Sequence, residues 1–379
     1  MSEPLRVLQV FAEMNRGGAE TMIMNLYRNI NRSKVQFDFV VHTKNKCAFD
    51  DEIRSMGGNI YNVPAYSGRN HFEYKKAWES FFKEHPEYKV IHGHVRSTAS
   101  IYLNTAKKYG LTTIAHSHNT SSGSGISAFV KNLLQYQIRY IADYLFACSQ
   151  NAGTWLFGEK ACKNDNFFIL NNAIEAKKFV LNKDIRDKKR KELQLEDFFV
   201  VGHIGRFHPQ KNHTFIVDIF KEISEKNSKV KLLLVGEGTL REEIEKKVNN
   251  LGLSDKVIFT GVRPDIPELL QAMDVFLFPS LFEGLPVTLV EAQASGIKIF
   301  ASDTISKEAA ITDLINYYSL NSTSVEWANN ILKSKYSIKR KNYLSEIENA
   351  NYDIEKNSLW LEEFYKNIIL KQEMGVNNG

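Results

Sequence analysis

Short apolar runs alternate with segments of mixed polar and apolar residues along the chain. In residues 1–180 the runs are RVLQVF, FDFVVH, NIYNV, KVIHGH, TTIAHSH and DYLFACS. Helix-like segments lie between several of them, for example HFEYKKAWESFFKEH. Strands that alternate with helices and lack tight hairpins need crossover connections, which produce a parallel sheet. We therefore expect a doubly wound α/β domain in the first half.

The same pattern starts again after a charged stretch, LNKDIRDKKRKELQLED. The second set of apolar runs is FFVVGHIG, KLLLVGEG, KVIFTGV, VFLFPS and IKIFAS. One intervening helix is well marked, because Asp265 can cap it and Glu268 follows three residues later. Ligands of open α/β sheets bind beyond the carboxyl ends of the strands, so two such domains that face each other would form one cleft.

The last helical segment, EKNSLWLEEFYKNIIL, carries an apolar stripe that must pack on another part of the protein. We assign this stripe to Leu359, Leu361, Phe364, Ile368 and Ile369.

The stretch FEGLPVTLVEAQASG places Glu283 and Glu291 on either side of a Gly-Leu-Pro turn. Pro286 suits the first turn of a helix and Gly296 the position after its end, which predicts a helix over about 286–295. The free N–H groups at the start of a helix bind anions such as phosphates. The stretch therefore favours a phosphorylated, hydroxyl-rich ligand. The glutamates would accept hydrogen bonds from its hydroxyl groups. Alternatively, Glu283 is an ordinary loop residue and Glu291 is solvated.

Two further loops follow apparent strands and could contact such a ligand. GRFHPQKN offers Arg206 and Lys211, two cations that suit a diphosphate, although loop cations are usually only solvated. NRGGAE offers Gly17 and Gly18, which allow the backbone to approach a ligand closely. Neither loop has the G-x-G-x-x-G spacing of dinucleotide binding or the P-loop pattern, which disfavours a nicotinamide oxidoreductase.

Histidines end two of the buried strands. His116 and His118 run into a Gly/Ser-rich stretch, and the alternation of side chains along a strand points both to the same side. They are candidates for a catalytic or sugar-contacting group, unless neighbouring residues simply satisfy them. Together with the HGH stretch at 92–94 they form a group of four, but no carboxylate stands at ligand spacing and the chain has no D-x-D pair. We therefore predict no metal site.

Composition narrows the class of protein. The 379 residues are 43% hydrophobic and 25% charged, as in soluble globular proteins with two domains. Three scattered cysteines argue against disulfides and zinc. No apolar run is long enough to span a bilayer or to serve as a secretory signal, so we expect a cytoplasmic protein.

The net charge of +5 is concentrated in residues 1–180, where basic side chains outnumber acidic ones. This half could face phosphates or the anionic inner leaflet of the membrane. The aromatic and basic segment 126–147 could add a membrane contact, unless it is a core helix. Nucleic acid is disfavoured, because no zinc-finger, RNP-like or dense basic motif is present.

Taken in order, these motifs resemble the retaining glycosyltransferases of family 4, which have the GT-B architecture of two facing Rossmann-like domains. The similarity runs through GGAE, AHSHN, GRFHPQKN, LLLVGEGTLRE and the segment from VIFTGVRPDIPELL to IKIFAS. It is strongest with the branch that builds bacterial exopolysaccharide and other surface glycans. The resemblance implies an acceptor-side domain at 1–172, a donor-side domain at 173–350, and a final helix over 351–379 that crosses back to the first domain.

The resemblance also implies roles for individual residues. Arg206 and Lys211 would hold the donor diphosphate and stabilise the leaving group, so that no metal or other cofactor is required. Glu291 would accept the ribose hydroxyls, and Glu283 and His118, with His116 as the alternative, would contact the transferred sugar. The implied donor-binding set also includes residues of three loops: Gly17 and Gly18; Val262 and Arg263; and Gly284, Leu285, Pro286 and Val287.

The implied function is transfer of a sugar from a nucleoside diphosphate sugar, with UDP as the default carrier, to a glycan or polyprenyl-linked acceptor. Peripheral attachment to the inner face of the cell membrane is a further hypothesis, and the oligomeric state stays open. Two alternatives remain. A nucleotide-sugar epimerase or hydrolase would turn over the donor without an acceptor, and a non-catalytic nucleotide-sugar-binding scaffold would turn over nothing.

Overall fold

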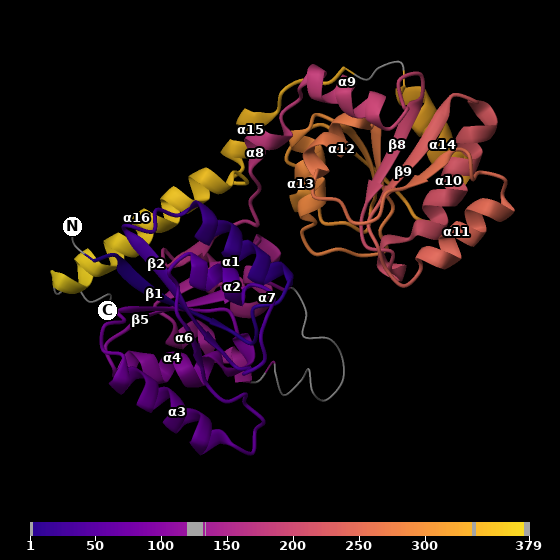
Figure 1. Cartoon of the computed structure of the whole chain (residues 1–379). Coiled ribbons are helices and arrows are strands. Elements are labelled where there is room, and N and C mark those ends of the chain that lie inside the picture. Colours follow the sequence, from indigo (N-terminus) through magenta and orange to yellow (C-terminus); the bar gives the residue numbers. More distant parts are fainter. Residues whose placement is uncertain (1–2, 120–131, 133, 336–338, 375–379) are drawn as a thin grey trace. The chain divides into compact units, whose positions relative to one another are not determined.

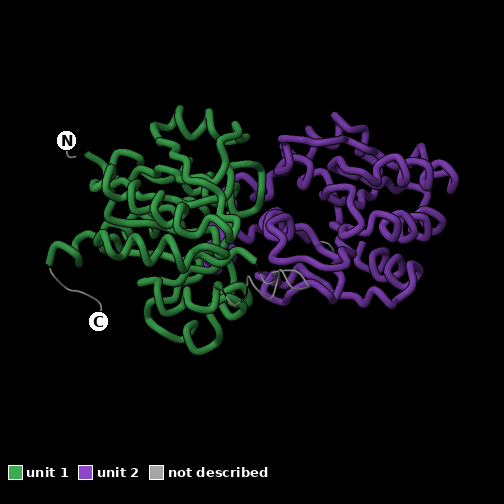
Figure 2. The backbone as a smooth tube through the Cα atoms, turned by 90° about the horizontal axis from the view of Figure 1, so that it is seen from below, with its two compact units in different colours: residues 1–173, 354–379 green, residues 174–353 purple. Residues whose placement is uncertain are grey.

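The computed structural model describes residues 3–119, 132, 134–335 and 339–374. The chain forms two compact units, coloured separately in Figure 2. Unit 1 comprises residues 1–173 and 354–379, and unit 2 comprises residues 174–353. The chain thus leaves unit 1, forms the whole of unit 2, and returns.

Unit 1 contains a seven-stranded parallel sheet with the order β3-β2-β1-β4-β5-β6-β7. Its strands are β1 (Leu5–Phe11), β2 (Val35–Val41), β3 (Ile60–Asn62), β4 (Val90–Gly93), β5 (Thr112–Ser117), β6 (Tyr144–Ala147) and β7 (Phe167–Ile169). The strand order reverses between β1 and β4. This reversal is the point at which open α/β sheets bind ligands.

Helices cover both faces of this sheet. They are α1 (Gly18–Asn29), α2 (Asp50–Ser55), α3 (His71–Glu84), α4 (Ala99–Lys108), α6 (Ile138–Ile141), α7 (Gln150–Phe157) and α16 (Ile354–Glu373). One core joins the sheet to α1, α2 and α16, and a second joins it to α3, α4, α6 and α7.

Unit 2 contains a six-stranded parallel sheet with the order β10-β9-β8-β11-β12-β13. Its strands are β8 (Phe199–Ile204), β9 (Val230–Val235), β10 (Val257–Phe259), β11 (Val275–Phe278), β12 (Lys298–Ser302) and β13 (Ile315–Tyr318). Its helices are α8 (Ala176–Phe179), α9 (Lys183–Glu192), α10 (His213–Lys226), α11 (Arg241–Asn250), α12 (Ile266–Ala272), α13 (Val287–Ala294), α14 (Ser324–Ser334) and α15 (Leu344–Asn349). Here the order reverses between β8 and β11, and helices again cover both faces (Figure 1).

The prediction of two doubly wound parallel sheets is confirmed, but two edge strands were missed. β7 and β13 are three and four residues long and are only partly buried.

The final helix α16 lies along α1 and β1 (Figure 1) and contributes Leu361, Tyr365 and Ile368 to the core of unit 1. Phe364 and Ile369 pack at the edge of the same core. The assignment of Leu359 to the apolar stripe was wrong, because 63% of this residue is exposed. Leu359 precedes Leu361 by two positions, which turns it about 200° around the helix.

The start of α12 also differs from expectation. Asp265 occupies the N-cap position but its side chain makes no capping hydrogen bond. Its carboxylate instead accepts from Arg263 at 2.7 and 2.6 Å and from Lys189 at 2.8 Å. These cations hold the pKa of Asp265 well below its usual range, with the bond to Arg263 the largest cause.

Across the described part of the chain, none of the helices combines the length and apolar character needed to cross a bilayer.

Candidate functional site

In unit 2 the cations and glutamates predicted to bind a donor lie where the strand order reverses. The GRFHPQKN loop follows the carboxyl end of β8, and the loop containing Glu283 follows β11, its neighbour in the sheet. The two loops are joined by a hydrogen bond of 2.8 Å from the N–H of Leu281 to the carbonyl of Gln210. Sheet topology therefore brings together two motifs that are some 70 residues apart in the sequence.

Lys211 and Glu283 form an ion pair across these loops. Lys211 Nζ lies 2.5 Å from Glu283 Oε1, and the Gln210 side chain donates to Glu283 Oε2 at 3.1 Å. The ammonium group also lies 4.8 Å from the centre of the Phe278 ring. Both charged side chains are largely buried. The ammonium therefore has a fixed position at the end of the sheet, where a diphosphate would replace or join its carboxylate partner.

Arg206 lies on the same loop but is exposed, and no ion pair or hydrogen bond links its guanidinium to another described residue. The backbone beneath it is held by the turn after β9. A Cβ added to Gly236, whose φ is +139°, would stand 2.1 Å from the carbonyl oxygen of Gly205. Only glycine permits this approach. The turn containing Gly236 thus supports the cationic loop from behind.

The predicted helix after Glu283 is confirmed as α13, with Pro286 at its N-cap and Gly296, at φ +68°, just after its end. Gly284 is exposed, while Leu285 and Val287 are partly buried and pack against the core of unit 2. The N–H of Leu289 donates to the carbonyl of Pro286 at 3.0 Å, whereas the N–H groups of Val287 and Thr288 precede the first helical hydrogen bond. These two groups are available to a ligand.

Glu291 lies one turn further along α13 and is partly buried. Its carboxyl group makes no hydrogen bond with the described residues, and burial raises its pKa to about 7. The interpretation of Glu291 as a solvated carboxylate does not fit this environment. A ligand whose hydroxyl groups donate hydrogen bonds to such a carboxyl group stabilises its charged form.

Glu291→Gln is expected to stabilise the ligand-free protein at pH 8 and to leave it nearly unchanged at pH 5. Between the usual pKa of 4.5 and the raised value of about 7, the unfolded chain loses a proton that the folded chain keeps. Stability therefore falls as the pH rises through this window. The glutamine variant removes this loss of stability. Its free energy of unfolding at pH 8 should therefore exceed that of the wild type by about 1–2 kcal/mol, and its melting temperature by roughly 3–6 °C.

Thermal unfolding at both pH values checks this prediction. Glu242→Gln is the matched control, because Glu242 is an exposed carboxylate of unit 2. An equal change for Glu291→Gln at pH 5 and pH 8 would contradict the raised pKa.

The loop after β10 carries Val262 and Arg263, which were predicted to lie against a base. Val262 is 75% exposed. Arg263 is engaged with Asp265 and lies 3.7 Å from Glu192. The exposed valine is free to contact a ligand, whereas the guanidinium of Arg263 already has carboxylate partners.

Unit 1 has a pocket of about 370 Å³ at its own reversal point, beyond β1 and β4. The residues lining it include Gly18, Glu20, His94, Arg96, His116, His118 and Asn172. Gly17 forms the N-cap of α1 and Gly18 its first residue. Space around Gly18 is open, while a Cβ on Gly17 would stand 2.1 Å from Glu20 Oε2. Residues 120–131 and 133 lie outside the described residues, while the rest of segment 126–147 contains α6 and β6.

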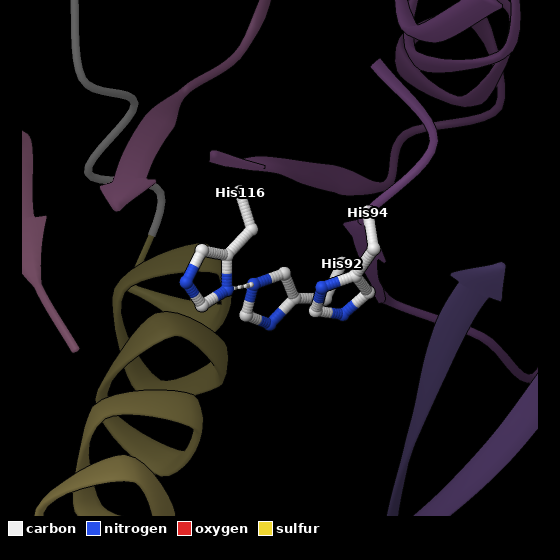
Figure 3. A group of neighbouring side chains, drawn as sticks. All are labelled: His92, His94 and His116. Carbon is white, nitrogen blue, oxygen red and sulfur yellow. Dashed lines mark hydrogen bonds between the residues drawn. The ribbon is translucent and has the colours of Figure 1, made fainter. Parts of the chain in front are cut away.

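Three histidines that line this pocket, together with the fully buried His92, form two hydrogen-bonded pairs. His92 Nε2 lies 3.1 Å from His116 Nδ1, as drawn in Figure 3, and His94 Nδ1 lies 2.8 Å from His118 Nε2. The pairs stack on one another, with ring centres 4.6 Å apart for His92 and His94 and 4.0 Å apart for His116 and His118. The prediction that His116 and His118 point to the same side is confirmed.

These imidazoles are held in the neutral form. Burial, and then the nearby His118, lower the pKa of His92 to about 3, and burial with the nearby Arg96 lowers the pKa of His118 to about 3. The pKa values of His94 and His116 are also well below their usual range, mainly because of burial. Neutral imidazoles each carry one donor and one acceptor, so each tautomer matters.

Ring nitrogen atoms of His92, His94 and His116 lie within 4.8 Å of one another, which is close enough for three ligands of one metal ion. The geometry does not favour it. A metal lies in the plane of each imidazole that binds it, but His92 and His94 stack, and the nitrogens between His92 and His116 already share a hydrogen bond. The group is organised as a hydrogen-bond network.

Sequence reasoning missed the partners of this network. His94 Nε2 lies 2.9 Å from Gln9 Oε1 of β1, and His92 Nδ1 lies 2.7 Å from the hydroxyl of Tyr365 on α16. Gln9 and Tyr365 are fully buried. The available signals were a glutamine inside an apolar strand and a tyrosine within the apolar stripe of the last helix, but neither signal identifies a partner.

The fold and the site together define the class of protein. Two doubly wound parallel sheets, each with polar groups at its reversal point, constitute a GT-B fold. The crystal structure of Anabaena Alr3699/HepE in complex with UDP has a similar fold, with a TM-score of 0.76 at 18% identity over 96% of this chain and 100% of that chain.

Sequence comparison gives the family. A model described as Glycosyltransferase Family 4 matches residues 16–178, and one described as Glycosyl transferases group 1 matches residues 184–345. The putative glycosyltransferase EpsF of Bacillus subtilis is 35% identical over 366 residues, covering 94% of this chain and 95% of EpsF. The capsular polysaccharide biosynthesis glycosyltransferase CapH of Staphylococcus aureus is 24% identical over 95% of this chain and 98% of CapH. The chain belongs to glycosyltransferase family 4, and it is an enzyme of the hexosyltransferase type.

Proposed function

We propose that this glycosyltransferase moves a sugar from a UDP-sugar to a glycan or polyprenyl-linked acceptor in bacterial polysaccharide biosynthesis. Transfer retains the configuration at the anomeric carbon and needs no metal. The observation that carries this proposal is the position of Lys211, fixed by Glu283 at the reversal point of unit 2, with Arg206 exposed on the same loop. Two cations there match the charge of a diphosphate.

The leaving group is a nucleoside diphosphate, on which negative charge develops as the bond to the sugar breaks. Lys211 and Arg206 stabilise this charge, a role that a bound metal ion fills in other enzymes. The first-turn N–H groups of α13 add donors on the same side. The carboxylate of Glu291 accepts hydrogen bonds from the ribose hydroxyls. These bonds lower the raised pKa of Glu291, because they favour its charged form.

In this proposal Glu283 of unit 2 and a histidine of unit 1 each contact the transferred sugar. Glu283 accepts hydrogen bonds from sugar hydroxyls once the donor phosphates bind Lys211. His118, or alternatively His116, also contacts the sugar. Retention follows when the acceptor hydroxyl attacks from the face that the phosphate leaves. The departing phosphate then takes the acceptor proton, so the protein supplies no nucleophile.

Comparisons support the carrier and the pathway in different ways. UDP is the nucleotide in the structure with a similar fold, and capsular polysaccharide is the product class named for one relative. The polyprenyl-linked acceptor is supported by the family resemblance and by the name of one relative, the UDP-Gal:alpha-D-GlcNAc-diphosphoundecaprenol alpha-1,3-galactosyltransferase of Escherichia coli, which is 26% identical over 57% of this chain. Attachment to the inner face of the membrane rests on the basic excess of residues 1–180.

Donor depletion tests the proposal. The purified protein is incubated with a panel of UDP- and GDP-sugars, with or without a bacterial membrane lipid extract, and with EDTA throughout. We expect release of UDP from one UDP-sugar, dependent on the extract and unaffected by EDTA. Nuclear magnetic resonance of the product then gives the anomeric configuration.

Each other outcome favours a different function. Conversion of the sugar nucleotide without an acceptor would establish an epimerase or hydrolase, and tight binding without turnover would establish a scaffold. Loss of turnover on EDTA treatment would refute the metal-independent mechanism.

A further inference from the structure

The two histidine pairs are joined at their inner end by a contact between β1 and α16. The side-chain amide of Gln9 donates from Nε2 to the hydroxyl oxygen of Tyr365 at 3.3 Å. The hydroxyl of Tyr365 also meets Nδ1 of His92 at 2.7 Å, and the oxygen of the Gln9 amide meets Nε2 of His94 at 2.9 Å. One amide and one hydroxyl therefore terminate both chains of hydrogen bonds.

The branch through Tyr365 has a defined direction. Because its oxygen accepts from Gln9, the buried hydroxyl directs its own proton to Nδ1 of His92; otherwise that proton is unpaired, which is unfavourable in a buried site. His92 then carries its proton on Nε2 and donates it to Nδ1 of His116. His116 in turn carries its proton on Nε2, which has no partner among the described residues.

The branch through Gln9 runs in the opposite sense. Its amide oxygen only accepts, so His94 carries its proton on Nε2 and presents a bare Nδ1. His118 donates to that atom from Nε2. Its own Nδ1 is left as a lone pair, again without a partner among the described residues.

If the Gln9 amide turns by half a rotation, every proton in both branches moves. Tyr365 then donates to Gln9 and accepts from Nδ1–H of His92, and all four histidines carry the proton on Nδ1. We propose that Gln9 and Tyr365 are positioning residues that force all four histidines into one common tautomer. The free nitrogens of His116 and His118 consequently always have opposite character, one a donor and the other an acceptor.

This pairing deepens the proposed function, on which it rests for the identity of the ligand. A hydroxyl group can donate and accept, so a sugar hydroxyl that reaches either nitrogen satisfies it in either state of the network. With the amide as it stands, His118 offers a lone pair to a sugar hydroxyl. The network thus selects for hydroxyl-bearing ligands against purely accepting anions at this pocket.

Nitrogen NMR of the ligand-free protein tests the network directly. Histidine labelled with ¹⁵N in the imidazole ring, assigned with single-histidine variants, reports which ring nitrogen carries the proton. The protein is treated with EDTA beforehand, and spectra are recorded at neutral pH. We expect the same tautomer at His92, His94, His116 and His118, with the proton on Nε2.

Tyr365→Phe should uncouple the branches. We expect mixed tautomers at His92 and His116, and a fall of about threefold to tenfold in kcat/KM for the sugar donor, the size expected for one buried hydrogen bond. Affinity for free UDP, which has no sugar, should not change. Tyr27→Phe is the matched control, because Tyr27 is a fully buried tyrosine of the same core whose hydroxyl contacts Gln36 and Met56.

A wild-type spectrum with different tautomers among the four histidines would overturn the proposal, as would a metal-bound histidine signal before EDTA treatment. An unchanged spectrum in Tyr365→Phe would also overturn it. If that variant does not fold, Gln9→Met tests the same junction. The wild-type spectrum does not depend on turnover, so failure of the proposed function would leave the common tautomer standing as a separate result.

Discussion

Lys211→Ala is expected to lower kcat/KM for the sugar donor by about 10²–10³, the range found when one group that stabilises developing charge is removed. In the ligand-free protein Lys211 is paired with Glu283 at 2.5 Å, so its ammonium group is already in place before a donor binds. Alanine removes that charge and also leaves the carboxylate of Glu283 without its cation. Both effects oppose binding of a diphosphate.

Steady-state kinetics with the donor identified by the depletion assay give the measurement. Lys221→Ala is the control, because Lys221 pairs with Glu225 on the exposed face of α10 in the same unit. The double variant Lys211→Ala with Glu283→Gln separates the two effects, since it removes the unpaired carboxylate. If activity recovers fully in the double variant, Lys211 serves only to neutralise Glu283 and the proposed role is wrong.

Leu361→Ala is expected to destabilise unit 1 by about 2–5 kcal/mol, the usual cost of truncating a fully buried leucine. Leu361 is 0% exposed and belongs to the core that α16 shares with α1 and β1. For a unit of this size the change corresponds to a fall of roughly 5–15 °C in melting temperature. The effect reaches residues far away in sequence, because the helix closes the core of the first 173 residues.

Leu359→Ala is the matched control, from the same helix and with the same chemical change. Leu359 is 63% exposed, so its loss should change stability by less than about 0.5 kcal/mol. Thermal unfolding followed by circular dichroism, with limited proteolysis to identify the unit that opens, measures both variants. Equal melting temperatures for the two variants would contradict the packing of α16 described above.

The contrast between these leucines illustrates what the sequence could supply. Short, mainly apolar runs identified the central strands, because burial on both faces leaves few polar positions. Two edge strands, β7 and β13, were missed. For Leu359, an apolar residue near a stripe was taken as part of it, although the helical turn places it on another side.

Site residues divide in the same way. Arg206, Lys211, Glu283 and Glu291 could be predicted as site residues because each is a charged residue in a loop or helix beside a recognisable turn. Gln9 and Tyr365 could not be found, since their contact spans 356 positions and depends on how α16 packs. Polar residues inside apolar segments indicate that a partner exists, but only the tertiary fold provides its identity.

The return of α16 to unit 1 has a consequence for folding during synthesis, because the ribosome makes this helix last. Domains commonly fold during synthesis, with the N-terminal one first. Here residues 1–173 leave the ribosome first but lack α16 until all 180 residues of unit 2, 174–353, have been made. The nascent first unit therefore waits with an uncovered apolar surface while the later unit folds. A nonsense mutation near residue 354 would spare the second unit and leave the first, with its histidine network, unfinished.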